Sequence, residues 1–452
     1  MAAVYNVPLG GALFAPTWVQ HLRYVRYNPF VMSGTIPPQG HRERIIEKLV
    51  QARLRTHGGV LLTGPKAVGK TTTARCFAAS EVRLDQDRAA LAAAQTDPRL
   101  VLDGEHPRLI DEYQLAAGIW NAVRGRIDDL GGKGLFLLTG SSTPESEEQS
   151  HTGARRIAAV QMRTMTLLER GLSSGAVSVG GLLDGSPAEA KPHRLSVTET
   201  IEALSIGGWP DNLTLTPADA LEANADYLDM IVHADIPRVD GARRDPDGVR
   251  RLLASYARNV ATNASLRTIA RAAEKPLGET TLHDYLRVLG RLFLIEDQPS
   301  WKPQLRSRVR LAATPKRHLA DPSLAVAALG ATPQRLLGPE IELAGFLFES
   351  QATHDLRVYA QPHRAEVRFY RDNKGLEIDA IVEAADGRWL AAEIKLGHHR
   401  VDEAARHLLA LKEKLSPATN AACGTLLVIV ADTPTYTRPD GILVTSIASL
   451  GP

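Results

Sequence analysis

Residues 64–71 read Gly64-Pro65-Lys66-Ala67-Val68-Gly69-Lys70-Thr71, and this stretch decides the fold of the N-terminal part of the chain. It matches the phosphate-loop pattern GxxxxGK[ST] at every fixed position. An apolar run precedes it at residues 57–63 (HGGVLLT), and the helix-forming run TTTARCFAAS follows at residues 71–80. A strand, a glycine-rich loop and a helix are what such a loop requires, because backbone N–H groups and the helix N-terminus must face the phosphates.

We expect this loop to bind ATP together with Mg²⁺. Lys70 would reach the β- and γ-phosphates, and the Thr71 hydroxyl would ligate the metal ion. The other residues of the loop and the first helical turn would surround the phosphates: Gly64, Pro65, Lys66, Ala67, Val68, Gly69 and Thr72. The alternative is a plain glycine turn that happens to carry a lysine, which the flanking strand and helix disfavour.

A second apolar run, residues 107–111 (PRLID), predicts a buried parallel strand that ends in Asp111-Glu112. Parallel sheets of this kind bind ligands at the carboxyl ends of their strands. Asp111 suits the magnesium shell, and Glu112 suits polarisation of the attacking water. Taken alone, an acidic pair after a strand is more often a helix N-terminus. With the phosphate loop upstream, the catalytic interpretation is favoured.

A third predicted strand, residues 134–139 (GLFLLT), leads to Ser141 and Ser142. Either hydroxyl could bind the γ-phosphate or the water, although a simple strand-to-turn ending explains them nearly as well. A polar stretch then leads to Arg155 and Arg156. One of them, for which we take Arg156, could act as an arginine finger on a neighbouring subunit's nucleotide. This predicts a homo-oligomer, whereas the alternative is a pair of solvated surface arginines.

The composition limits the class of protein. With 452 residues the chain needs roughly two to four domains. Hydrophobic residues make up 44% and charged residues 23%, and no run is long enough for a membrane-spanning helix, so we expect a cytoplasmic protein without a membrane partner. The N-terminus does not read as a secretory signal, and Cys76 and Cys423 do not suggest a disulfide framework. The net charge of +2 means that any nucleic-acid surface must be local.

The middle of the chain is mainly helical. Residues 195–241 contain the breaker GGWP at 207–210, and residues 265–295 read as helix, Pro/Gly turn, helix and apolar strand. That order outlines a winged helix-turn-helix, whose basic side chains could contact nucleic-acid phosphates. The alternative is a helix pair that only packs between domains. The basic residues concerned are Arg267, Arg271, His283, Arg287 and Arg291.

Two strand-like runs near the C-terminus carry acids in alternation: residues 375–382 (GLEIDAIV) and 389–395 (WLAAEIK). A period of two places Glu377 with Asp379 on one face of the first strand, and Glu393 with Lys395 on one face of the second. Three acids and a lysine could therefore converge. The alternative is the solvated face of an ordinary hairpin.

The motifs GPKAVGKTT, LIDEYQ, LLTGSS and GGWP resemble, in order and spacing, those of bacterial and archaeal AAA+ ATPases whose C-terminal region is a domain of unknown function. The resemblance covers residues 34–414. It implies an ATP-hydrolysing core, a small helical lid, a winged helix and a restriction-endonuclease-like terminal domain. One departure is that relatives often have a simple Gly-Arg where this chain has Gly-Ala-Arg-Arg at residues 153–156.

The terminal acids are similar to the PD-(D/E)xK nuclease signature, although no proline precedes the aspartate. In that signature Asp379 and Glu393 would bind Mg²⁺, Lys395 would position or activate water, and Glu349 would be a further acid from the preceding helix. The same fold also occurs as a scaffold without catalysis.

The expected fold class is α/β, with a P-loop AAA+ parallel sheet followed by lid, winged helix and nuclease-like domain. We expect an ATPase coupled to a domain that binds nucleic acid, DNA or RNA, and could cleave it. The alternative is an ATP-driven switch, related to toxin or defence systems, whose terminal domain recognises a partner protein. The expected boundaries are 1–41 (N-terminal segment), 42–194 (ATPase core), 195–241 (lid), 242–299 (winged helix), 300–339 (linker) and 340–452 (nuclease-like).

Overall fold

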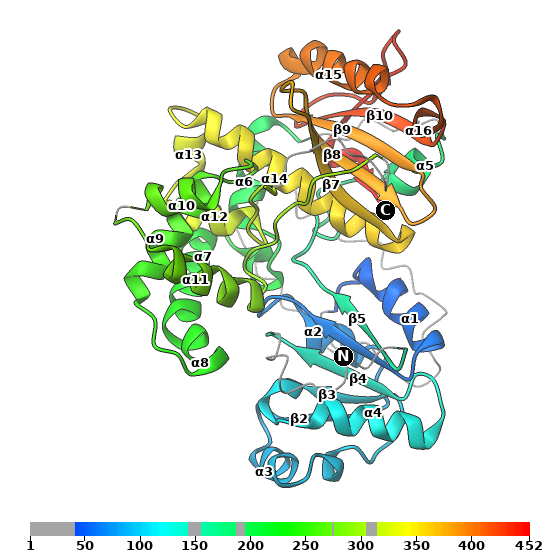
Figure 1. The fold of residues 1–452 in the computed structure, drawn as a ribbon, viewed down its shortest axis with the longest axis vertical. Helices are drawn as coiled ribbons and strands as arrows, with labels where there is room; N and C mark the ends of the chain where they lie inside the picture. Colours follow the sequence, from blue (N-terminus) through cyan, green and yellow to red (C-terminus); the bar gives the residue numbers. More distant parts are fainter. Residues whose placement is uncertain (1–40, 143–154, 187–194, 274, 304–313) are drawn as a thin grey trace, which may run out of the picture.

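The computed structural model describes residues 41–142, 155–186, 195–273, 275–303 and 314–452 (Figure 1). Its first part is a five-stranded, fully parallel sheet with the strand order β2-β3-β4-β1-β5. The three strands predicted from the sequence are confirmed, as β1, β3 and β4. The strands are β1 Gly59–Thr63, β2 Ser80–Arg83, β3 Arg108–Asp111, β4 Phe136–Gly140 and β5 Ile157–Gln161.

Both faces of this sheet are buried, which explains why its central strands are apolar throughout. On one face Leu61 and Leu138 pack against Trp120 and Val123 of α4. On the other face Leu62 belongs to a larger core that includes α1 and continues into the helical region. The helices of this part are α1 Ile46–Thr56, α2 Lys70–Arg75, α3 Arg88–Thr96 and α4 Ile119–Leu130.

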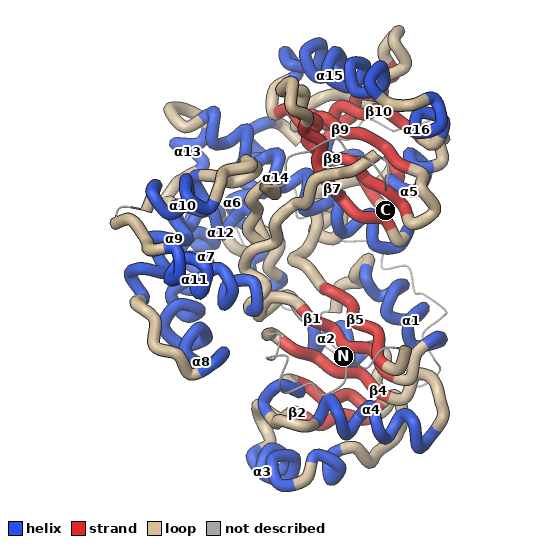
Figure 2. Tube along the Cα trace, in the orientation of Figure 1, coloured by secondary structure: helices blue, strands red, loops and turns tan. Residues whose placement is uncertain are grey.

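A helical region lies beside the two sheets (Figure 2). Residues 300–339, expected as a linker, contribute α12 and α13, and α12 packs against α6, α7 and α9. Among the described residues, no helix is long and apolar enough to cross a membrane. The helices are α6 Val197–Ile206, α7 Pro217–Met230, α8 Ile236–Asp240, α9 Pro246–Arg258, α10 Leu266–Ala272, α11 Glu279–Arg291, α12 Pro322–Ala328 and α13 Pro333–Leu336.

The C-terminal part is a six-stranded mixed sheet with the order β11-β12-β10-β9-β8-β7. Helix α14 packs on β7, β8 and β9, and α15 contacts β8, β9 and β10. Separate apolar clusters fill the space under the two helices, so the sheet is covered on both faces. The elements are α14 Ile341–Ala360, α15 Val401–Lys414, α16 Pro417–Ala421, β7 Ala365–Arg371, β8 Glu377–Ala384, β9 Trp389–Lys395, β10 Cys423–Val430, β11 Tyr436–Thr437 and β12 Leu443–Ser446.

After β5, residues 177–183 pack against the C-terminal part of the structure. Strand β6 (Val177–Ser178) pairs in parallel with β13 (Leu450–Gly451) at the end of the chain. Helix α5 (Val179–Leu183) packs on β10, and its Leu182 is buried in the same core as α14. These residues fall within the range expected for the ATPase core, yet they pack into the terminal domain.

This packing makes Gly424, in β10, a sensitive position. A Cβ atom there would lie 2.3 Å from the carbonyl oxygen of Leu182 and 2.4 Å from that of Leu183, both backbone atoms of the α5 segment. We predict that Gly424→Ala destabilises the protein by about 1–3 kcal/mol in thermal or denaturant unfolding, because overpacking must displace backbone. The matched control is Gly345→Ala in α14, where a Cβ would meet nothing within 4 Å. It should be stabilising by about 0.5–1 kcal/mol. Equal effects of the two substitutions would contradict this account of α5.

Candidate functional site

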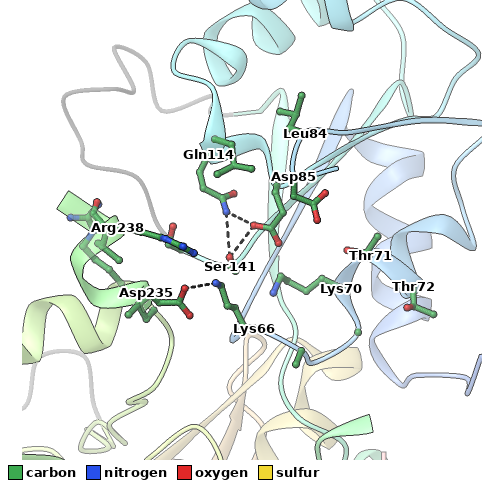
Figure 3. Close-up of a pocket in the computed structure, with 18 of the residues that line it drawn as sticks. Lys66, Lys70, Thr71, Thr72, Leu84, Asp85, Gln114, Ser141, Asp235 and Arg238 are labelled. Carbon is green, nitrogen blue, oxygen red and sulfur yellow. Dashed lines mark hydrogen bonds and ion pairs between the residues drawn. The ribbon is translucent and has the colours of Figure 1, made fainter. Parts of the chain in front are cut away.

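The carboxyl ends of the central strands open into a cavity of about 920 Å³ (Figure 3). The phosphate loop forms one wall, and residues after β3 and β4 form another. The helical region closes the cavity from the opposite side with α8 and the end of α11. Its polar lining comes from Lys66, Lys70, Thr71, Thr72, Asp85, Glu112, Gln114, Ser141, Asp235, Arg238 and Arg291, among other residues.

The phosphate loop adopts a conformation that its glycines permit. Gly64 has a φ of +146°, and a Cβ there would lie 2.1 Å from the carbonyl oxygen of Met162, so only glycine fits. The Lys70 side chain is buried, and its Nζ donates hydrogen bonds to the carbonyl oxygens of Gly64, at 3.0 Å, and Pro65, at 2.7 Å. Burial lowers the pKa of Lys70 to about 8. A nucleotide phosphate could replace the two carbonyls as the partner of this ammonium.

Asp111, at the end of β3, is buried and contacts residues of β2 and β4 as well as the helix after the phosphate loop. Its Oδ1 accepts hydrogen bonds from Thr71 Oγ1, at 2.8 Å, and from Thr139 Oγ1, at 2.5 Å. Arg83 lies 3.5 Å from the other carboxylate oxygen. The hydroxyl of Thr71 and the carboxylate of Asp111 are oxygen donors of the kind that Mg²⁺ prefers beside nucleotide phosphates, so the two residues fit the predicted metal role.

Glu112 follows in a left-handed backbone conformation, with a φ of +54°. Its Oε2 accepts a hydrogen bond of 2.9 Å from Ser141 Oγ and a further one from Gln114 Nε2. The structure thus brings the predicted Glu112 and Ser141 together. Gln114 was not among the predicted site residues, although it stands two positions after Glu112 in the motif LIDEYQ.

The helical region contributes groups that sequence reasoning missed. Asp235 ends a π-helical turn, Ile231–Asp235, and forms an ion pair with Lys66 of the phosphate loop. Arg238, on α8, lines the cavity on the same side (Figure 3). Arg291, predicted for the nucleic-acid helices, also lines this cavity, and it donates a hydrogen bond to the carbonyl oxygen of Val239 at 3.2 Å. No local motif marks these positions, because they face the loop only through the tertiary fold.

Arg156 lies at the other end of the sheet. Its carbonyl oxygen accepts a hydrogen bond from Gly59 N, at the amino end of β1, and its guanidinium forms an ion pair of 2.9 Å with Asp128. The phosphate loop follows the carboxyl end of β1, so Arg156 does not belong to the cavity of its own chain. The preceding residues 143–154 lie outside the described part of the structure.

The predicted terminal residues do come together. Lys395 Nζ lies 2.8 Å from Asp379 Oδ2 and 2.5 Å from Glu393 Oε2. An unexpected residue joins them: Lys316 Nζ lies 2.5 Å from Glu349 Oε1, 2.8 Å from a Glu377 oxygen and 3.2 Å from Asp379 Oδ1.

In the terminal cluster, neighbouring charges together outweigh the effect of burial on the pKa values of Lys316 and Asp379. Burial alone would lower the pKa of Lys316, but Glu349, Asp379 and Glu377 outweigh it and raise that pKa well above its ordinary value. Burial would raise the pKa of Asp379, but Lys316 and Lys395 lower it. Within the described ranges, no group of three Asp, Glu, His or Cys side chains is placed to hold a metal ion. The arrangement therefore does not fit the magnesium site expected at Glu349, Asp379 and Glu393.

The predicted basic residues of the helix pair are largely exposed. Arg267 and Arg271 project from α10, and His283 and Arg287 from α11. Arg287 forms an ion pair of 2.9 Å with Asp284, so part of its charge is balanced within the helix. Isolated β-bridges, Ile295 with Leu319 and Gln298 with Lys316, follow α11.

Comparison with protein families gives three matches along the chain. Residues 56–170 match an AAA domain, residues 197–335 a domain of unknown function, DUF8612, and residues 344–450 another, DUF4143. The uncharacterized protein Rv2008c of Mycobacterium tuberculosis is 26% identical over 344 residues, covering 74% of this chain and 70% of that protein. The uncharacterized protein Mb2031c of Mycobacterium bovis gives the same values.

Similar solved structures have low overall scores. The Walker-type ATPase PABY2304 of Pyrococcus abyssi is 14% identical, with coverage of 62% of this chain and 94% of that chain and a TM-score of 0.39. AMPPCP-bound DnaA from Aquifex aeolicus is 13% identical, with 58% and 92% coverage and a TM-score of 0.27. Similarity at this level supports no functional conclusion. The phosphate loop, the strand order and the AAA match together show that the chain contains an AAA-type P-loop ATPase domain.

The lowered pKa of Lys70 predicts that ATP binding depends on pH. Below pH 8 the ammonium is already charged, whereas above pH 8 it must take up a proton to bind phosphate. ATP binding should therefore weaken by up to about tenfold per pH unit above pH 8, with nearly one proton taken up at pH 9. Isothermal titration in buffers of different ionisation enthalpy measures that uptake. Lys70→Arg, which stays charged, is the control. The same uptake in this variant would contradict the assignment to Lys70.

Proposed function

We propose that this protein binds and hydrolyses ATP with Mg²⁺ in the cavity between its phosphate loop and its helical region. The observation that carries the proposal is the sharing of Asp111 Oδ1 by Thr71 and Thr139 beside the buried Lys70. A metal-binding hydroxyl, a carboxylate and a phosphate-binding ammonium then lie together at the carboxyl edge of one sheet. This combination is suited to holding a triphosphate.

Each residue has a separate role in this proposal. Lys70 leaves the carbonyls of Gly64 and Pro65 and pairs with the phosphates. Thr71 and Asp111 would hold Mg²⁺, which when bound neutralises phosphate charge. Glu112 orients the attacking water and accepts its proton, and Ser141 and Gln114 fix the position of the Glu112 carboxylate.

Nucleotide binding would alter the contact between the helical region and the phosphate loop. Lys66 is paired with Asp235, so a phosphate that attracts Lys66 would weaken the contact between the loop and α8. Arg238 and Arg291 line the same cavity and could bind the phosphates in turn. Nucleotide binding would thereby change how the helical region sits on the ATPase domain.

We also propose a homo-oligomer, in which Arg156 serves a neighbouring subunit. Its place at the amino edge of the sheet keeps it out of its own cavity, and its side chain is 46% exposed beside Asp128. An arginine in such a position can act on bound nucleotide only between chains.

Two substitutions separate binding from hydrolysis. Lys70→Ala should weaken ATP binding, because the phosphates lose their main cation. Glu112→Gln should bind ATP normally and lower kcat by roughly 100-fold or more, because the general base is lost. The control is Glu105→Gln, at an exposed position before the amino end of β3. Calorimetric titration and phosphate release measure the two properties. A wild-type protein that binds no ATP with magnesium, or a Glu112→Gln variant with full turnover, would contradict the proposal.

A second proposal is that α10 and α11 bind the phosphate backbone of nucleic acid. It is supported by the exposed Arg267, Arg271, His283 and Arg287 on two consecutive helices. Of the acids on α11, Asp284 is already paired with Arg287 and with Arg244, whereas Glu279, at the start of the helix, is exposed. For the terminal domain, the internal pairing of its acids favours the alternative without cleavage, in which the domain recognises a partner.

The triple variant Arg267→Ala, Arg271→Ala, Arg287→Ala tests this surface. Loss of three phosphate contacts should weaken DNA or RNA binding and reduce the slope of log K against log salt by up to about 3. The control variant removes the same charge at exposed positions elsewhere: Arg55→Ala, Arg99→Ala, Arg406→Ala. Fluorescence anisotropy across a salt series gives both quantities. Equal loss in the two triple variants would assign the binding to overall charge, and no binding by the wild type would end the proposal.

A further inference from the structure

We propose that Lys316 is the built-in cation of the terminal domain, and that its ammonium occupies the place a divalent cation would need among Glu349, Glu377 and Asp379. The terminal domain would then take no catalytic metal ion, although it carries the acids of a nuclease-like sheet. This inference does not depend on ATP hydrolysis.

The geometry of Lys316 carries the proposal. Its side chain is only 1% exposed, and its Nζ lies within 3.2 Å of carboxylate oxygens from three different residues. Those residues come from two elements: Glu349 from α14, and Glu377 and Asp379 from β8. A single cation therefore joins the helix to the sheet at the position where the acids converge.

Further cationic side chains lie beside the same carboxylates and beside Glu393. Lys395 binds both Asp379 and Glu393. Arg371 lies 3.0 Å from the second oxygen of Glu377, and His407, on α15, lies 3.4 Å from the second oxygen of Glu393. Each of the four carboxylates thus faces at least one cationic side chain. A divalent ion would have to displace an internal partner from a buried position, which is costly.

The backbone holds Lys316 in place. Lys316 N donates to the carbonyl oxygen of Gln298 at 3.0 Å, and Gln298 N donates back to that of Lys316 at 2.8 Å. The Gln298 side chain then donates a hydrogen bond of 3.0 Å to the carbonyl oxygen of Asp379. The residue that supplies the cation is therefore tied to the strand that supplies the acid, and the segment after α11 is fastened to the terminal sheet.

The chemical consequence follows from what an ammonium lacks. It neutralises carboxylates and donates hydrogen bonds, but it holds no exchangeable water and does not act as a Lewis acid at phosphorus. With Lys316 in this position, the acids stabilise the junction between helical region and sheet. The domain could still recognise a partner through its outer surface.

Manganese binding without nucleotide tests the proposal, with Mn²⁺ as the probe and electron paramagnetic resonance as the readout. The wild-type protein should show no Mn²⁺ site that Asp379→Asn removes. Lys316→Met should create one, because the buried Glu349 and Asp379 and the partly exposed Glu377 lose the ammonium that they share. The melting temperature of Lys316→Met should fall by about 10 °C and rise again with Mn²⁺. The double variant Lys316→Met, Asp379→Asn should lose the new site.

Lys395→Met is the matched control, since it removes the other ammonium while Lys316 stays in place, and it should gain no manganese site. A wild-type site that Asp379→Asn abolishes, or metal-dependent cleavage of DNA or RNA lost in the same variant, would overturn the proposal. A folded Lys316→Met that binds no manganese would also overturn it. If Lys316→Met does not fold, the wild-type comparison with Asp379→Asn still decides the question.

Discussion

One carboxylate oxygen, Oδ1 of Asp111, receives the hydroxyls of both Thr71 and Thr139. Asp111 ends β3, Thr139 lies in β4, and Thr71 lies in α2, directly after the phosphate loop, so the contact joins the helix that follows the loop to two strands of the sheet. The same hydroxyl of Thr139 accepts a hydrogen bond of 3.0 Å from Glu112 N, and the Glu112 carboxylate in turn accepts one from Ser141, so the predicted catalytic residues are linked to this contact. Because parallel strands have their carboxyl ends at one edge of the sheet, the phosphate loop, Glu112 and Ser141 line a single cavity.

The acidic cluster of the C-terminal sheet has different neighbours from the acids near the phosphate loop. Beside Asp111 the sheet edge opens into the cavity, and the nearby cations are Arg83, 3.5 Å from the carboxylate, and Lys70, whose ammonium is hydrogen-bonded to the carbonyl oxygens of Gly64 and Pro65. Around Asp379 the acids face internal ammonium groups, of which Lys316 is fully buried. The first arrangement leaves room for a metal ion and phosphates, whereas the second is already neutralised from within. We therefore propose that two clusters with similar residue types serve different functions, because different groups pack against them.

The sequence was informative wherever neighbours along the chain decide the structure. The phosphate loop and strands β1, β3 and β4 depend on short motifs and apolar runs, and the structure confirms those strands. Alternation also placed Glu393 and Lys395 together correctly. Lys316 and Asp235 could not be found in this way, because each acts on residues more than thirty positions distant, through tertiary contacts. The packing of α5 on β10 was missed for the same reason, as no local pattern assigns Leu182 to the terminal core.

The most direct test of the whole account is a crystal structure with a non-hydrolysable ATP analogue and manganese, using anomalous scattering to locate the metal. We expect nucleotide density along the phosphate loop, with Lys70 on the phosphates and one manganese ion beside Thr71 and Asp111. We expect no anomalous signal among Glu349, Asp379 and Glu393. An empty phosphate loop, or a manganese ion in the terminal cluster with Lys316 displaced, would contradict the account.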